Sequence, residues 1–160
     1  MSGMVWEERE RASLLPYKEE IATLAQSLKG VLGADVIVVD KYLNRIVNTF
    51  HYLYNSADIR INSVVGNIVT TQKLQMIYDR KYFTDCVNCP DYTTCELGGV
   101  FGTPIFSGEE CIGAVAFLVA PNQVVAFQQK QTPIIDFLRQ ISVLISEMVQ
   151  NESRSGMLTG

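Results

Sequence analysis

The sequence predicts an α+β fold in which a five-stranded antiparallel sheet is flanked by N- and C-terminal helices. Three observations predict it. Apolar residues recur at helical spacing within 16–32 and within 133–149. The stretch between them holds short runs rich in β-branched residues. Several of these runs are separated by only a few turn-forming residues, a spacing that joins antiparallel neighbours.

The first helix is expected to start near Pro16, because proline suits the first helical position, where its missing N–H would have no partner anyway. Gly30 or Gly33 is expected to end it. The apolar stripe of this helix consists of Ile21, Leu24, Ala25, Leu28 and Leu32.

Five strands and one short helix are expected between the two long helices. In the second strand, alternation places Ile46, Asn48 and Phe50 on one face, with Val47 and Thr49 on the other. The last strand is long and apolar, so it is expected at the centre of the sheet. The predicted strands cover 35–40, 45–50, 74–78, 100–106 and 111–120, and the short helix covers 63–71 with Ser63 as its N-cap.

Pro121 and Asn122 are expected to break the last strand, and the second long helix to begin with Thr132 as N-cap and Pro133 at the first helical position. Its apolar stripe extends beyond one face, with Ile135 and Val143 outside the main row. The excess predicts a homodimer, although packing against two elements of the same domain would also explain it. The main row is Ile134, Phe137, Leu138, Ile141, Leu144, Ile145, Met148 and Val149.

Length and composition indicate one domain with a full hydrophobic core. The chain has 160 residues, of which 48% are hydrophobic, and its net charge is -4. The negative charge and the lack of a basic stripe argue against direct contact with nucleic acid. The longest apolar run is too short for a membrane span, and the charged N-terminus lacks an apolar signal region. A cytoplasmic location with reduced thiols is therefore expected.

Three of the four cysteines lie close together in a polar segment. Cys86, Cys89 and Cys95 have the spacing C-x2-C-x5-C, and Cys111 follows on the next strand but one. Thiolates are soft ligands that suit zinc, an iron–sulfur cluster or Cu(I). The alternatives are redox-active thiols or cysteines that serve only as small buried residues. The first three cysteines are the expected metal ligands, and the candidates for a fourth are Cys111, Asp91, Glu96 and His51.

Aromatic residues on both sides of the cysteine segment are candidates for a small-molecule pocket. Packing in the core is the alternative role for them. The candidate ligand-binding residues are Tyr52, Tyr78, Phe83 and Phe101. With one histidine in the chain and no supporting motif, no Ser/His/Asp catalytic set is indicated.

The order of elements and several segments resemble GAF domains, relatives of PAS domains. They are also similar to the N-terminal input domains of sigma-54-dependent bacterial transcriptional regulators. The resemblance covers residues 15–150, which leaves 1–14 as an N-terminal extension and 151–160 as a polar linker. The segments that carry it are L-P-Y-K-E-E-I at 15–21, G-A-D-V-I-V-V-D at 33–40, S-V-V-G-N-I-V-T-T at 63–71, C-V-N-C-P-D-Y-T-T-C-E at 86–96, T-P-I-F-S-G at 103–108 and I-G-A-V-A-F-L-V-A at 112–120.

The resemblance implies a sensor without catalytic activity, which detects a small-molecule or redox effector and passes the signal through the terminal helices of a homodimer. It also implies an ATPase domain and a helix-turn-helix farther along, neither of which this sequence contains. Family members often carry a further cysteine where this chain has Thr103. Cys111 is expected opposite Phe106, roughly 10 Å along the strand from Thr103, so direct replacement is not assured. The alternatives are a GAF-like thiol enzyme that reduces free methionine sulfoxide and a zinc-stapled interaction module.

Overall fold

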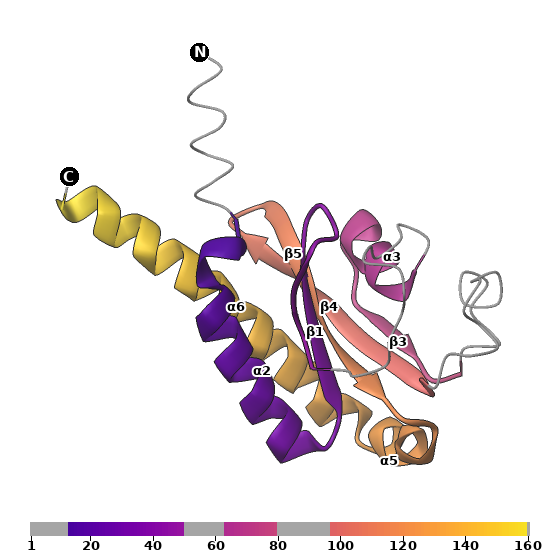
Figure 1. The fold of residues 1–160 in the computed structure, drawn as a ribbon. Helices are drawn as coiled ribbons and strands as arrows, with labels where there is room; N and C mark the ends of the chain where they lie inside the picture. Colours follow the sequence, from indigo (N-terminus) through magenta and orange to yellow (C-terminus); the bar gives the residue numbers. More distant parts are fainter. Residues whose placement is uncertain (1–12, 50–62, 80–96, 160) are drawn as a thin grey trace.

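The computed structural model describes residues 13–49, 63–79 and 97–159, with side chains described up to residue 150. It confirms the predicted fold class: an antiparallel five-stranded sheet with flanking helices (Figure 1). In chain order the elements are η1 (Leu15–Tyr17), α2 (Lys18–Leu32), β1 (Asp35–Asp40), β2 (Arg45–Asn48), α3 (Val64–Thr71), β3 (Gln75–Ile77), β4 (Gly99–Ser107), β5 (Glu110–Val119), η3 (Pro121–Gln123), α5 (Val124–Gln129) and α6 (Gln131–Thr159).

The strands lie in the order β2-β1-β5-β4-β3, so the long apolar strand β5 is central, as predicted. It pairs with β1 on one side and with β4 on the other, and every pairing in the sheet is antiparallel. β3 pairs with β4 only from Gln75 opposite Gly102 to Ile77 opposite Val100. The second half of β4 therefore extends beyond its partner on that edge.

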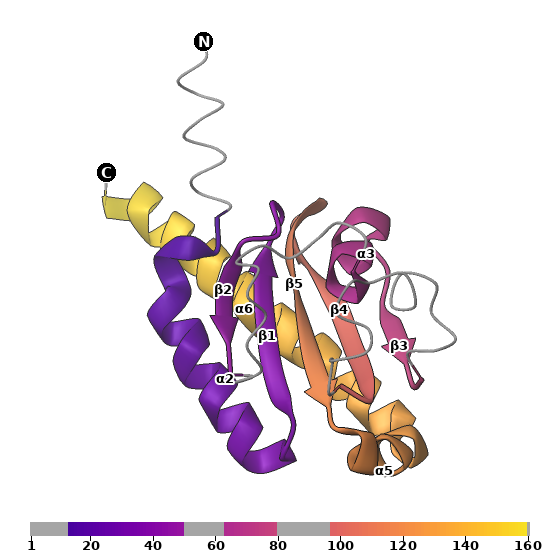
Figure 2. The same ribbon diagram turned by 45° about the vertical axis from the view of Figure 1, so that its right-hand side comes forward.

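The long helices α2 and α6 cover the same face of the sheet, which we call the two-helix face (Figures 1 and 2). Large side chains fill this side, because β4 and β5 turn Phe101, Ile105 and Phe117 toward the helices, all fully buried. α2 packs on β1 and β2, whereas α6 packs chiefly on β4. The main helical contributors are Ile21, Ala25 and Leu28 from α2, and Ile134, Leu138, Ile141, Ile145 and Val149 from α6.

The opposite side, which we call the α3 face, is covered in part by the short helix α3. Here β4 and β5 present small residues, Gly102, Ala114 and Ala116, so the helix approaches closely. A methyl group on Gly102 would come within 2.6 Å of Ile68 Cδ1 and 2.8 Å of Ala116 Cβ. Ile68 thus fills the space that a larger residue in β4 would need.

The predicted helix ends are confirmed at two positions. Gly33 follows α2 in the left-handed conformation, with φ 71°, and its N–H donates to the Lys29 carbonyl at 2.9 Å. Ser63 caps α3, because its Oγ accepts a 2.9 Å hydrogen bond from the Gly66 N–H.

The β2 alternation was predicted incorrectly. Val38 pairs with Val47, but Val39 pairs with Arg45, so the register shifts and Ile46 is the extra residue. As a result Ile46 and Val47 both belong to the two-helix core, although alternation assigned them to opposite faces. Arg45 instead lies opposite Val39, on the α3 face.

The end of the chain also differs from the prediction. A 3-10 turn and α5 follow β5, and only Phe127 of α5 is buried. α6 begins at Gln131, because the Lys130 carbonyl accepts the first helical hydrogen bond from Ile134; Thr132 is therefore inside the helix and is not its N-cap. The helix continues through the polar stretch 151–159, and its C-terminal part runs past the body of the domain (Figures 1 and 2). None of the helices in the described ranges is long and apolar enough to cross a bilayer.

Candidate functional site

The cysteine segment is attached at one end of the sheet. Cys86, Cys89 and Cys95 lie outside the described residues, as do Asp91 and Glu96. The chain leaves the described part after β3 and returns just before β4. Because these two strands are antiparallel neighbours, with Ile77 opposite Val100, the segment 80–96 starts and finishes at the same end of the sheet.

Two glycines form the base of this segment. Gly98 N–H donates to the Val119 carbonyl at 2.8 Å, and a methyl group on Gly98 would lie only 2.5 Å from Pro121 Cα. A methyl group on Gly99 would lie 2.7 Å from the Ile77 carbonyl oxygen. Glycine is needed at both positions because the backbone passes between β3 and the turn that follows β5.

Two of the predicted ligand-binding aromatics lie together on the two-helix face. The rings of Tyr78 and Phe101 are 5.3 Å apart, and Phe101 stacks on Phe127 of α5 at 5.7 Å. The Tyr78 hydroxyl oxygen is buried and finds no hydrogen-bond partner in the part of the chain that the structure describes. Burial raises the pKa of Tyr78. This cluster faces α5 and α6, and Tyr52 and Phe83 lie outside the described residues.

Cys111 and the described residues that follow the cysteine segment lie at opposite ends of β5. It is buried, pairs with Phe106 beside the β4–β5 turn, and donates to the Gly113 carbonyl at 3.4 Å. Burial raises the pKa of its thiol, so the protonated form predominates at neutral pH.

The register separates Cys111 from Cys95. Residues before β4 enter the sheet beside Val119, eight residues and roughly 26 Å along β5 from Cys111. Cys95 precedes Leu97 by two residues, which span at most about 7 Å. Cys111 thus lies at the opposite end of β5 from Gly98, where the chain returns from the cysteine segment; the other three predicted ligands lie outside the described residues, so the metal site stays a prediction.

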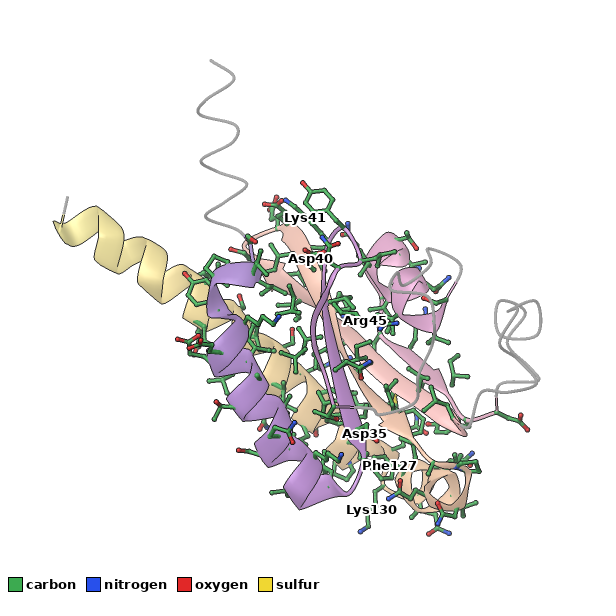
Figure 3. The ribbon with its side chains drawn as sticks, viewed as in Figure 1. Asp35, Asp40, Lys41, Arg45, Phe127 and Lys130 are labelled. Carbon is green, nitrogen blue, oxygen red and sulfur yellow. The ribbon has the colours of Figure 1, made fainter. Side chains whose placement is uncertain are left out.

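The described residues bring together no group of three His, Cys, Asp or Glu side chains that could hold a metal ion. His51, the remaining alternative ligand, lies outside those ranges. The acidic residues at the ends of β1 and at the start of β5 have structural partners instead. Asp40 accepts hydrogen bonds from the N–H groups of Tyr42 and Asn44, and Lys41 pairs with Glu110 across two turns (Figure 3). Asp35, at the other end of β1, pairs with Lys29 at 3.2 Å.

Two serines that sequence reasoning missed join α6 to β4. Ser142 Oγ donates to the Pro104 carbonyl at 2.9 Å, and Ser146 Oγ donates to the Phe106 carbonyl. These carbonyls lie on the edge of β4 beyond the end of β3, and Pro104 has no N–H to leave unpaired there. The distance between the two serines along α6 matches the distance between the two carbonyls along β4, because four helical residues rise about 6 Å and two strand residues about 6.6 Å. We call this pair of contacts the serine clasp.

Arg45 was also missed, because no feature of the sequence indicates the β2 bulge. It places a half-buried guanidinium group on the α3 face, opposite Val39 and near the part of the sheet that α3 does not cover (Figure 3).

No protein-family model and no curated protein matches this sequence. Solved structures do match it. One similar solved structure is the type II free methionine-R-sulfoxide reductase of Thermoplasma acidophilum, with a TM-score of 0.60 and 16% identity, covering 87% of this chain and 96% of that one. Another is the GAF domain region of a Geobacter sulfurreducens protein, with a TM-score of 0.62 and 16% identity, covering 90% and 98%.

A third is the free methionine-R-sulfoxide reductase of Neisseria meningitidis, solved with its substrate. It has a TM-score of 0.52 and 16% identity, and the match covers 88% of this chain and 81% of that one. At such identities the likeness concerns the fold, and one fold carries many functions. The sheet order, the two-helix face and these neighbours together establish that this chain has a GAF-like fold.

Proposed function

We propose that this chain is a signal-input domain: it detects a small molecule, a metal or a redox change at the cysteine segment and passes the change to α6. The observation that carries the proposal is the position of β4. This strand begins two residues beyond the segment 80–96, and the serine clasp bonds its far half to α6. One strand thus connects the candidate site with the longest helix.

The base of the segment is built so that a displacement would be transmitted. Gly98 and Gly99 are packed against backbone atoms of Pro121 and Ile77, which leaves little room for movement at the base alone. In this proposal, a displacement that reaches Gly98 and Gly99 is passed to β4 or to the turn before α5, which they contact. Any effector must bind two arrangements of these elements with different affinity, since equal affinity would shift nothing.

We further propose that this chain is the input domain of a bacterial sigma-54-dependent transcriptional regulator. The resemblance of residues 86–96, 103–108 and 112–120 to such domains supports this. We place this role in the cytoplasm and without direct contact to nucleic acid, the latter because the net charge is -4. Cys86, Cys89 and Cys95 would hold zinc or an iron–sulfur cluster, and a residue other than Cys111 would be the fourth ligand.

Anaerobic purification followed by metal and sulfide analysis tests this proposal. Iron and acid-labile sulfide would support a cluster sensor, and one zinc per chain would support a zinc-stapled module. Cys89→Ser should remove the metal while Cys111→Ala should leave it in place. Metal that survives Cys89→Ser would refute the assignment of the three cysteines.

A second candidate is a free methionine sulfoxide reductase, because two proteins of the same fold have that activity. A thiolate would attack the sulfoxide sulfur and release methionine, leaving a sulfenic acid. A second thiol would then form a disulfide and release water, and an external dithiol would reduce the disulfide. The protonated, buried Cys111 is a poor nucleophile, so the reaction would need the cysteines of the segment.

Turnover of free methionine-R-sulfoxide with dithiothreitol distinguishes the two functions. A metal-free protein with turnover that is lost in Cys86→Ser, Cys89→Ser or Cys95→Ser would establish the enzyme. If no preparation turns over the sulfoxide, the enzyme is ruled out and the sensor remains the proposed function.

A further inference from the structure

The middle of α6 exposes an apolar pair. Val143 is 55% exposed and Leu144 is 44% exposed, whereas Ile141 and Ile145 on the sheet side are 3% and 0% exposed. The apolar surface of α6 is therefore wider than the sheet covers, and Val143, one of the residues outside the predicted main row, faces away from the core.

Opposite charges flank Val143 symmetrically. Arg139 precedes it by four residues and Glu147 follows it by four, which places each charge about 6 Å from Val143 along the helix. Residues spaced by four form one ridge on a helix surface. All three are exposed, and neither charge belongs to the ion pairs within the described part of the chain. We call Arg139, Val143 and Glu147 the outer ridge of α6.

We infer that the outer ridge binds a second copy of this chain, with the two α6 helices antiparallel and crossing at Val143. In an antiparallel pair, a residue before the crossing point lies level with the residue equally far beyond it on the other helix. Arg139 then faces Glu147 of the partner subunit, and the two-fold axis repeats this contact. The exposed apolar pair forms the centre of the contact, and the charges form its rim, as in other protein interfaces.

The charges select this orientation over the parallel one. If the two-fold axis ran along the helices, each side chain would meet its own copy, so Glu147 would face Glu147 of the partner subunit. Like charges at such a contact disfavour the pairing, whereas the antiparallel arrangement makes two opposite-charge contacts.

Only α6 side chains form this contact. The dimer is therefore independent of the proposed sensing, which concerns the cysteine segment and β4. The serine clasp points toward the sheet side of α6, so both contacts can be present on the same helix.

Sedimentation velocity of the full chain across the micromolar range tests the inference through charge reversal. The wild-type chain is expected to form a dimer that weakens as salt is raised. Arg139→Glu and Glu147→Arg should each raise the dimer dissociation constant by about tenfold or more, because each creates two like-charge contacts. The double variant should regain most of the wild-type affinity.

Matched controls separate this contact from the effect of net charge. Glu20→Arg on α2 makes the same charge change as Glu147→Arg, and Lys130→Glu makes the same change as Arg139→Glu; both sites are exposed, and neither control should alter the dimer. Circular dichroism melts would confirm that each variant folds. A wild-type chain that is monomeric throughout would overturn the inference, as would single variants that dimerise normally or a double variant as weak as the singles.

Discussion

The two faces of the sheet are built in opposite ways. On the two-helix face, β4 and β5 direct large side chains such as Phe101 and Phe117 into a deep layer beneath α2 and α6. On the α3 face, the same strands present Gly102, Ala114 and Ala116, and an eight-residue helix lies close against them. The first face is stabilised by large side chains, and the second requires small ones beneath α3. Truncating a side chain should therefore destabilise the first face, and enlarging one should destabilise the second.

Emptying the two-helix face should have the largest effect. Phe117→Ala removes a fully buried ring that also packs against Phe137 of α6, at 6.3 Å between centroids. The free energy of unfolding should fall by about 3–5 kcal/mol, from the lost transfer energy and the cavity left behind. Urea denaturation measures the loss. A loss below about 1 kcal/mol would mean that this face is not the main core.

Filling the α3 face should come next. Gly102→Ala places a methyl group against Ile68 and Ala116, and overpacking of this kind costs about 1–3 kcal/mol. Ile68→Val removes the methyl group that is in the way, so Gly102→Ala should cost less in that background. Gly30→Ala is the control, since it meets nothing within 4 Å on the exposed side of α2 and should not destabilise. Equal cost in both backgrounds would contradict the close approach of α3.

Small and large side chains alternate in β5 from Ala114 to Phe117, so this part of the sequence already distinguishes the two faces. The central position of β5 was predicted from its long apolar run, and both long helices were predicted from apolar residues at helical spacing. The bulge at Ile46 could not be predicted, since it depends on how β2 pairs with β1. Nor could α5 be predicted, because six residues with one buried side chain give too little periodicity.

The candidate site was predictable only in part. The cysteine spacing marks the segment 80–96, and Cys111 pairs with Phe106 as predicted. The distance along β5 between Cys111 and the start of β4 became clear only from the full register of the two strands. Serines spaced by four on a helix are common, so the serine clasp becomes visible only when the unpaired edge of β4 is known.

The serine clasp should contribute a smaller amount than either face. Ser142→Ala and Ser146→Ala each remove a hydrogen bond to a β4 carbonyl and should cost about 1 kcal/mol. Ser27→Ala on α2 is the matched control, because its hydroxyl bonds an exposed helical carbonyl of Thr23. Chemical denaturation of the three variants measures this, and clasp variants as stable as the control would show that α6 is held by apolar contacts alone.

The smallest effect concerns Cys111 and appears only in alkaline solution. Burial raises its pKa above the ordinary value of 9.0, so above that pH the unfolded chain loses a proton that the folded chain retains. Stability from this group is complete below pH 9 and falls as the pH rises toward the folded pKa. Under reducing conditions the wild type should lose stability relative to Cys111→Ala between about pH 9 and pH 10.5, which lies above the pKa of a thiol in an unfolded chain. A constant difference between the two proteins across that range would contradict the burial of the thiol.

Hydrogen exchange followed by mass spectrometry tests most directly whether β4 joins the cysteine segment to α6. Wild-type protein prepared anaerobically would be compared with a variant carrying serine at 86, 89 and 95, and with each protein in a Ser142→Ala, Ser146→Ala background. We predict that the cysteine substitutions change exchange in both 99–107 and 131–150, and that the change in 131–150 is lost when the clasp is removed. Unchanged exchange in 131–150 despite a change in 99–107 would contradict this account.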